Sequence, residues 1–390
     1  MQSKKRHKKR FRLFILKTIV FLLILFLAFK GLSFLTNSKE ERELKKLNYS
    51  NEAITLIIDN KIDKYLINNN LYSKTLEVAL TEGQYESKLL EEYVYFPYKD
   101  YDGYITQLNE LNLIGYKRED IEQVFKVLDK NEINTIIKKE TVINNLVNYI
   151  NNEYFEMNSL DRYVQYKKDH SAYEYDKVVA YVNMFLDYDY YDHTIDVKQP
   201  DELLVIVNKY YKLSSGFIPK GLVKIDSKNS YNNYEFWVLP VVKENFMNIL
   251  SDMKKVGLEI QVKSAYRSYQ TQVDSYNDYV RSNGKEATDT FSARAGYSEH
   301  QTGLAIDVKA TDGTYSTFVT SKEYDWMKNN AHKYGFIMRY PEDKTDITGY
   351  KFESWHFRYV GNDIAKYIYE KELTFDEYYA RFIANKKTNN

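Results

Sequence analysis

Two short segments rich in metal-binding side chains constrain the fold of this chain more than any other part of its sequence. They are Ser298-Glu-His300-Gln-Thr-Gly303-Leu-Ala305-Ile-Asp307 and, 46 residues further on, Glu353-Ser-Trp-His356. Two imidazoles and one carboxylate can bind a catalytic Zn²⁺ and leave a fourth coordination position for water. A second carboxylate, Glu353, could accept the proton of that water. We therefore predict a fold that gathers His300, Asp307 and His356 around one zinc ion, with Glu353 as the general base.

The residues next to these ligands predict two strands. Side chains alternate over Leu304–Val308, so a strand there points Asp307 away from the face that carries the apolar residues. Gly303 allows the chain to turn just before this strand, and His300 can then fold back toward the same metal. A second strand over Trp355–Val360 would place His356 and Arg358 on one face.

Beyond residue 200, short apolar runs alternate irregularly with helical patterns. Further strands are expected at Leu203–Val207, Leu222–Ile225 and Glu259–Lys263, and helices at Pro240–Val256, Tyr269–Asn283 and Glu323–Lys333. A steady strand–helix–strand rhythm is missing. We therefore predict that residues 195–385 form an α+β domain with a largely antiparallel sheet.

Residues 40–190 have a different composition and read as mainly α-helical. Only four of the 14 Gly residues precede position 200. Apolar residues recur at three-and-four spacing over Asn51–Ile58, Arg118–Phe125 and Thr141–Val147. Leu47–Ile54 also resembles Ile114–Ile121, an offset of 67 residues, although chance similarity explains so short a match equally well. A helical module of this kind could dock a protein partner.

The N-terminus predicts a membrane anchor. Residues 1–12 are strongly basic, and residues 13–35 are apolar except for Lys17 and Lys30 near the two ends. A helix of this length rises roughly 35 Å, which is enough to cross a bilayer. The basic tail should remain in the cytoplasm, so the rest of the chain is expected outside the cell membrane. A cleaved signal peptide is the alternative, but Ala28-Phe-Lys-Gly31 offers no clear cleavage site.

Charge and cysteine content exclude other classes of function. Residues 1–39 hold ten of the 55 Lys and Arg residues, whereas all 55 Asp and Glu residues follow them. The body of the protein is therefore acidic, which argues against nucleic-acid binding. Cysteine is absent, so disulfides and thiolate metal sites are excluded and only His and carboxylates remain as strong zinc ligands.

At the level of motifs, the chain resembles the zinc D-alanyl-D-alanine carboxypeptidases of the VanY type, which include L,D-carboxypeptidases of the bacterial cell wall. The resemblance rests on Ser298-x-His300-x-x-Gly303-x-Ala305-x-Asp307, on Glu353-x-Trp355-His356 and on Tyr266-Arg267-Ser268. It extends over about residues 195–370, where further matches are Val207-Asn208-Lys209, Pro219-x-x-Leu222-Val223, Gly335-Phe336-x-x-Arg339-Tyr340-Pro341, Thr348-Gly349 and Arg358-Tyr359-Val360-Gly361.

This resemblance implies a role for each matching position. His300, Asp307 and His356 would bind Zn²⁺, and Glu353 would be the general base. Arg267 would contact the carboxylate of the substrate or the oxyanion, and Gln272 and Ser298 would line the substrate pocket. The implied fold is the small α+β zinc-peptidase fold that is shared with the lysostaphin and hedgehog groups.

We therefore expect a membrane-anchored exopeptidase that removes the C-terminal D-alanine from the stem peptide of peptidoglycan, with D,D-cleavage favoured. The alternatives are an L,D-carboxypeptidase, an endopeptidase that cuts within the stem or the crossbridge, and a non-catalytic module that binds wall peptide. Such modules usually lack the base or a ligand, whereas this chain has all four residues.

Overall fold

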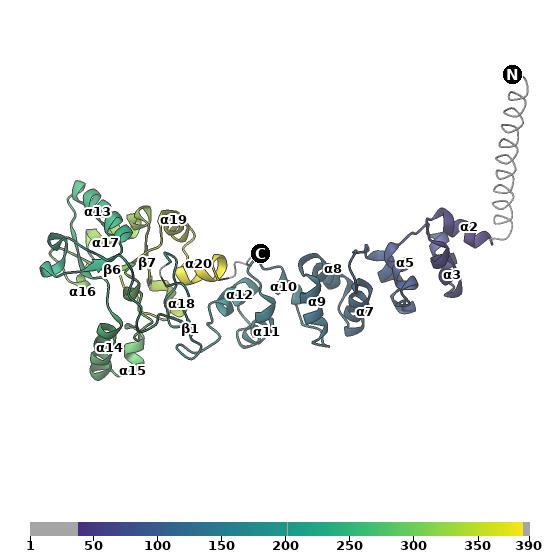
Figure 1. Ribbon diagram of the computed structural model, residues 1–390, viewed down its shortest axis with the longest axis horizontal. Coiled ribbons are helices and arrows are strands. Elements are labelled where there is room, and N and C mark those ends of the chain that lie inside the picture. Colours follow the sequence, from purple (N-terminus) through teal and green to yellow (C-terminus); the bar gives the residue numbers. More distant parts are fainter. Residues whose placement is uncertain (1–37, 201, 385–390) are drawn as a thin grey trace, which may run out of the picture. The chain divides into compact units, whose positions relative to one another are not determined.

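The computed structural model describes residues 38–200 and 202–384, which form two compact units: residues up to 150, and residues from 151 onward (Figure 1). The predicted basic tail (1–12) and membrane anchor (13–35) lie outside the described residues. Within the described ranges, no helix is both long enough and apolar enough to cross a membrane.

The first unit consists of helices. Several begin after a polar residue that caps them; Ser50, for example, accepts a hydrogen bond from the backbone N–H of Ala53 and caps the helix that follows it. The helices are α2 (Lys39–Lys46), α3 (Asn51–Asp59), α4 (Asp63–Asn68), α5 (Lys74–Thr81), α6 (Leu90–Tyr95), α7 (Tyr104–Ile114), α8 (Arg118–Val127), α9 (Lys130–Ile137) and α10 (Leu146–Ile150).

The two copies of the short sequence match share a tyrosine contact. The hydroxyl of Tyr49, before α3, accepts the backbone N–H of Ser73, and the hydroxyl of Tyr116, before α8, accepts that of Ile143. A second matching pair is formed by Tyr93 and Tyr163. Each of these two hydroxyls accepts a backbone N–H seven residues upstream and donates to an asparagine side chain on a later helix.

The second unit begins with two helices that lie within residues 40–190, the range predicted to form the separate helical region. These are α11 (Leu160–Asp169) and α12 (Tyr175–Asn183). α12 packs against α20 (Phe375–Phe382), and the Tyr181 hydroxyl on α12 donates to Asp346 at 2.9 Å. These contacts place the boundary between the units near residue 150, rather than between residues 190 and 195.

A four-stranded antiparallel sheet forms the centre of the second unit. Its strands are β5 (Ile260–Ser264), β6 (Ala305–Ala310), β8 (His356–Tyr359) and β7 (Phe336–Met338), and they lie in that order. Asp307 on β6 lies directly opposite His356 on β8. Two pairs of two-residue strands lie outside this sheet: β1 (Ile195–Asp196) with β2 (Tyr211–Lys212), and β3 (Val223–Lys224) with β4 (Trp237–Val238).

The two faces of the sheet have different roles. Leu304, Ile306 and Val308 belong to the main apolar core, together with side chains of α13 (Pro240–Lys255) and α17 (Lys322–Asn330). A smaller apolar cluster joins Ile337 of β7 to α19 (Asn362–Glu370) and α20. Because side chains alternate along a strand, Asp307 and Ala305 lie on the face opposite the main core. Figure 1 shows α13, α17 and α19 around the strands.

The α+β class, the antiparallel sheet and most of the predicted elements are confirmed. The helix α14 (Tyr269–Asn283), for example, has the predicted bounds. Two predictions are wrong. Leu203–Val207 is a turn and an extended segment rather than a strand, because the carbonyl groups of Leu203 and Val205 accept hydrogen bonds from the Arg358 guanidinium. The helix expected over Thr141–Val147 begins only at Leu146, since Asn145 has a positive φ of 58°.

Candidate metal centre and active site

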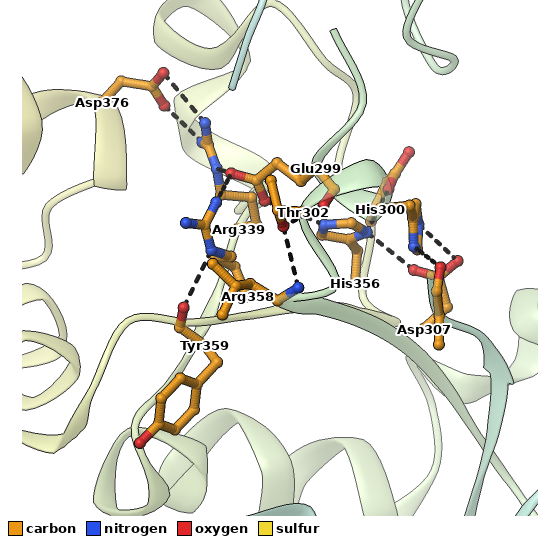
Figure 2. Close-up of polar contacts among 12 residues, drawn as sticks. Glu299, His300, Thr302, Asp307, Arg339, His356, Arg358, Tyr359 and Asp376 are labelled. Carbon is orange, nitrogen blue, oxygen red and sulfur yellow. Dashed lines mark hydrogen bonds and ion pairs between the residues drawn. The ribbon is translucent and has the colours of Figure 1, made fainter. Parts of the chain in front are cut away.

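Three side chains from two segments converge on the sheet face opposite the main core. His300, Asp307 and His356 are all buried, and each offers one ligand atom within 4.8 Å of the others. Nε2 of His300 lies 3.3 Å from Oδ2 of Asp307, and Nδ1 of His356 lies 2.9 Å from Oδ1 of the same carboxylate (Figure 2). The cross-strand pairing of Asp307 with His356 produces this arrangement, because paired residues project side by side from one face.

Hydrogen bonds fix the orientation of both imidazoles. Nδ1 of His300 lies 2.8 Å from the backbone oxygen of Ala265, which leaves its Nε2 lone pair for a metal. Nε2 of His356 faces Oε2 of Glu299 at 3.4 Å, which leaves its Nδ1 lone pair. The two histidines would therefore bind a metal through different ring nitrogens, and each second nitrogen has an oxygen acceptor, as is usual for ligand histidines.

A tight turn delivers His300 to the site. The 3₁₀ helix η5 (Glu299–Thr302) ends at Gly303, whose φ of +70° is in the left-handed region that favours glycine. The chain then enters β6 directly. The turn that the sequence predicted before this strand is confirmed.

Glu353 lies beside the ligands without being one of them. Its Oε2 is 4.0 Å from Nδ1 of His356, and its side chain is only 13% exposed. Burial raises the pKa of the Glu353 carboxyl group to about 8, with His356 and Arg267 opposing this shift and Asp307 and Glu299 adding to it. The backbone N–H of Glu353 donates to the carbonyl of Tyr340, which holds the carboxylate at the entry to β8.

The ligands themselves have strongly perturbed pKa values. Burial raises the pKa of Asp307, but His300 and His356 outweigh this effect and hold it well below its usual range. Burial lowers the pKa of His300. It also acts on His356, where the hydrogen bonds to Asp307 and Glu299 prevail and raise the pKa to about 9.

All seven predicted site residues line one cavity of about 370 Å³. Arg267 is half-buried, and its guanidinium donates to Oε1 of Gln272 at 2.8 Å and to Oγ of Ser264 at 3.0 Å. Gln272 in turn donates to the carbonyl of Ala293. Ser298 is buried at the start of η5. The Arg267 guanidinium, held by these hydrogen bonds, therefore lines the same cavity as the metal ligands and Glu353.

Several residues of the cavity were not predicted as site residues. The Tyr315 hydroxyl donates to Oδ2 of Asp307 at 3.4 Å, and its ring packs against Trp355 with ring centroids 5.1 Å apart. Tyr340 packs against the imidazole of His356. The remaining lining residues are Tyr279, Phe291, Ser292, Ala293, Glu299 and Tyr350. Tyr340 and Glu299 fall within quoted motifs, whereas the sequence around Tyr315 carries no such signal.

The donor atoms fit zinc. Bonds of roughly 2.0–2.2 Å from zinc to nitrogen and oxygen place neighbouring ligand atoms of a tetrahedron roughly 3.3 Å apart. His300 Nε2 lies 3.3 Å from Oδ2 of Asp307 and His356 Nδ1 lies 2.9 Å from Oδ1, both near this value, and one ligand atom from each of the three side chains lies within 4.8 Å of the others. Three protein ligands leave one position open, as in catalytic rather than structural zinc sites. Fold and site together define a metallohydrolase with a His₂Asp centre.

Residues 236–362 match the sequence model of the family described as VanY, D-alanyl-D-alanine carboxypeptidase. The chain is 35% identical over 190 residues to the YodJ protein of Bacillus subtilis (strain 168), a match that covers 47% of this chain and 70% of that protein. It is 33% identical over 183 residues to VanXYC of Enterococcus gallinarum, named as a bifunctional D-Ala-D-Ala dipeptidase and D-Ala-D-Ala carboxypeptidase; this match covers 45% of this chain and 93% of that one.

A solved structure of a mutant of the vancomycin-resistance D,D-pentapeptidase VanY in complex with Zn(II) has 31% identity to this chain. It covers 45% of this chain and 99% of its own, with a TM-score of 0.40. The chain belongs to the VanY family of D-alanyl-D-alanine carboxypeptidases. Its cofactor is Zn²⁺, its second unit carries the zinc-peptidase fold of the family, and it is a zinc-dependent hydrolase.

Proposed function

We propose that this protein is a membrane-anchored carboxypeptidase that removes the C-terminal D-alanine from peptidoglycan stem peptides, with the D,D bond as the favoured site of cleavage. The observation that carries the proposal is the single cavity that holds the His300, Asp307 and His356 cluster, the Glu353 carboxylate and the Arg267 guanidinium. A relative named for both D-Ala-D-Ala carboxypeptidase and dipeptidase activity supports the choice of substrate.

His300, Asp307 and His356 would hold the metal, which supplies acidification of a water molecule and polarisation of the scissile carbonyl group. Glu353 is placed to take the proton of that water, because its carboxylate lies 4.0 Å from the ligand atom of His356 and inside the same cavity. The same carboxyl group then returns the proton to the departing amine of D-alanine. Such proton transfer contributes roughly 10²–10⁴-fold to rate.

Arg267 would bind the negative charge of the substrate. Two of its N–H groups are engaged by Gln272 and Ser264, which fixes the plane of the guanidinium and leaves the others free to donate. A planar fork of this kind suits a free C-terminal carboxylate, which only an exopeptidase substrate presents at this position. Alternatively, the same group could stabilise the developing oxyanion.

Digestion of defined muropeptides tests this function. A D,D-carboxypeptidase converts pentapeptide to tetrapeptide and releases free D-alanine, whereas an L,D-carboxypeptidase acts on the tetrapeptide. Mass spectrometry should show D-alanine release from the pentapeptide, and a chelator should abolish it. Products cut within the stem or crossbridge would indicate an endopeptidase. Wall binding without any product at full zinc occupancy would indicate a non-catalytic module.

The location is also part of the proposal. We place residues 1–12 in the cytoplasm, residues 13–35 across the membrane and both folded units outside, where peptidoglycan is found; the charge asymmetry of the N-terminus supports this orientation. Protease added to intact protoplasts should digest both units. Their complete protection would contradict an external location.

The helical unit is proposed to dock a protein partner involved in wall synthesis or division. Its tandem helical arrangement supports this role, since stacked helical repeats commonly present extended binding surfaces. A deletion of residues 40–150 respects the structural boundary and leaves α11 and α12 with the enzyme. Unchanged localisation of this variant in the cell would contradict the docking role.

A further inference from the structure

We infer that Glu299 is a positioning residue for the zinc site, which accepts the Nε2 proton of His356 and thereby turns the Nδ1 lone pair of that ring toward the metal. The inference rests on the proposed function in one respect: His356 must be a zinc ligand.

The geometry of His356 carries the first step. Its two ring nitrogens face two different carboxylates: Nδ1 is 2.9 Å from Oδ1 of Asp307, and Nε2 is 3.4 Å from Oε2 of Glu299 (Figure 2). His356 and Glu299 are 3% and 1% exposed, so both contacts are shielded from bulk solvent. An imidazole that binds a metal is neutral and has one protonated nitrogen and one lone pair. A proton held on Nε2 by Glu299 therefore leaves the lone pair on Nδ1, on the side of Asp307 and His300.

Two arginines hold Glu299 in this position. Its Oε1 accepts from Nε of Arg339 at 2.8 Å and from Nη1 of Arg358 at 2.9 Å. The other oxygen, Oε2, is left to face the imidazole.

A further layer of contacts holds the arginines. Asp376 on α20 accepts two hydrogen bonds from Arg339, at 2.6 Å and 3.2 Å, and one from Asn208 at 2.7 Å. Arg358 also donates to the carbonyl groups of Leu203 and Val205. The two guanidinium groups and the two carboxylates of this network balance in charge, and all four side chains are buried.

The network gives a role to two motif residues, Arg339 and Arg358, that take no direct part in the proposed catalysis. Arg339 and Arg358 do not line the cavity, yet they contact Glu299, which does. A ligand histidine generally depends on an acceptor for its second ring nitrogen, and loss of that acceptor lowers metal affinity by roughly 10–100-fold. Glu299 is the acceptor for His356, in the way that the Ala265 carbonyl is for His300.

Zinc affinity of the full-length protein, measured by competition with a chromogenic chelator, tests the inference. Glu299→Ala should raise the zinc Kd by about 10–100-fold, and Glu299→Gln, which returns an oxygen acceptor without the charge, should recover part of the loss. Asp187→Ala is the matched control, because it removes a carboxylate that pairs with Arg162 in the same unit but does not contact the site. Equal zinc affinity of Glu299→Ala and the control would overturn the inference.

A measurement on the unmodified protein covers the case in which Glu299→Ala fails to fold. Histidine ¹⁵N NMR of the zinc-loaded protein should show His356 bound through Nδ1, with a slowly exchanging proton on Nε2. Coordination through Nε2 would overturn the inference alone. An unmodified protein that binds no zinc would instead overturn the proposed function, so the two failures are distinguishable.

Discussion

At the scale of single residues, the proposed roles separate metal binding from proton transfer. Glu353→Gln should keep zinc, because Glu353 is not among the three clustered ligands, and should lower kcat by roughly 10²–10⁴-fold. His300→Ala should lose zinc and activity together. Zinc content by elemental analysis and D-alanine release measure the two effects. A Glu353→Gln protein with full activity would rule out its role as the base.

Arg267 can be assigned to the terminal carboxylate by the choice of substrate. The unmodified enzyme should cleave a peptide with a free C-terminus about 10–100-fold better, in kcat/KM, than the same peptide with an amidated C-terminus, because a hydrogen bond to a charged group is worth about 1.5–3 kcal/mol. Arg267→Met should lose this preference and retain zinc. If the preference survives in Arg267→Met, another group binds the carboxylate, and the oxyanion role becomes the better assignment.

The predictability of the site also varies from residue to residue. The ligands and Glu353 follow from side chains whose chemistry and spacing are recognisable in the sequence, whereas the cavity position of Arg267 was expected from the resemblance to the VanY type. Glu299 lies in the same motif, but its role depends on Arg339, Arg358 and Asp376. All three lie at least 40 residues further along the chain. Such long-range contacts leave no local pattern.

At the scale of elements, the loop before η5 should be sensitive to a single methyl group. Gly296 has a φ of +88°, and a Cβ atom there would lie 2.9 Å from the backbone oxygen of Leu213. Gly257 has a φ of +75° but no atom within 4 Å of such a Cβ, which makes it a matched control. Gly257→Ala should cost about 1–2 kcal/mol in free energy of unfolding, the penalty for a left-handed conformation.

Gly296→Ala should lower the free energy of unfolding by clearly more than Gly257→Ala does. The Leu213 backbone must move to make room for the Cβ atom, and the N–H group of Leu213 donates a hydrogen bond to the Gly296 carbonyl that this movement would disturb. It should also weaken zinc binding, since the loop leads into the turn that carries His300. Denaturant unfolding and chelator competition give both quantities. Equal unfolding free energies for the two variants would contradict this prediction, because they would mean that the loop accommodates the added methyl group without loss of stability.

The elements that the sequence predicted well are those whose pattern reflects burial on one face. Alternation over Leu304–Val308 indicated β6, because Leu304, Ile306 and Val308 enter the main core. The apolar run Leu203–Val207 gave the same signal for a different reason: its side chains are buried in part, but its carbonyl groups bond to Arg358 instead of a neighbouring strand. Composition alone does not distinguish these cases.

At the scale of the whole molecule, Lys209 should give the stability a specific pH dependence. Its Nζ donates to the Asp289 carbonyl at 2.6 Å and lies 4.5 Å from the ring centroids of Tyr190 and Tyr350. Burial lowers the pKa of Lys209 to about 8, with Asp289 opposing and Arg294 adding to the shift. In the unfolded chain the pKa is about 10.4, so between these values the unfolded state binds more protons.

Stability should therefore rise with pH over this window, relative to a Lys209→Met variant in which the group cannot titrate. The comparison cancels the titration of other groups. Denaturant unfolding of both proteins at several pH values from about 7 to about 11 measures it. The unfolding free energy of the unmodified protein minus that of Lys209→Met should increase with pH. A value that stays constant or decreases would contradict a lowered pKa for Lys209.

The central claim is that one zinc ion, held by His300, Asp307 and His356, enables this protein to release D-alanine from a stem peptide. The most direct test adds zinc stepwise to the metal-free, full-length protein and follows D-alanine release from a pentapeptide muropeptide. Activity should rise in proportion to bound zinc and reach its maximum at one ion per chain. Full release without zinc, or none at full occupancy, would contradict the claim.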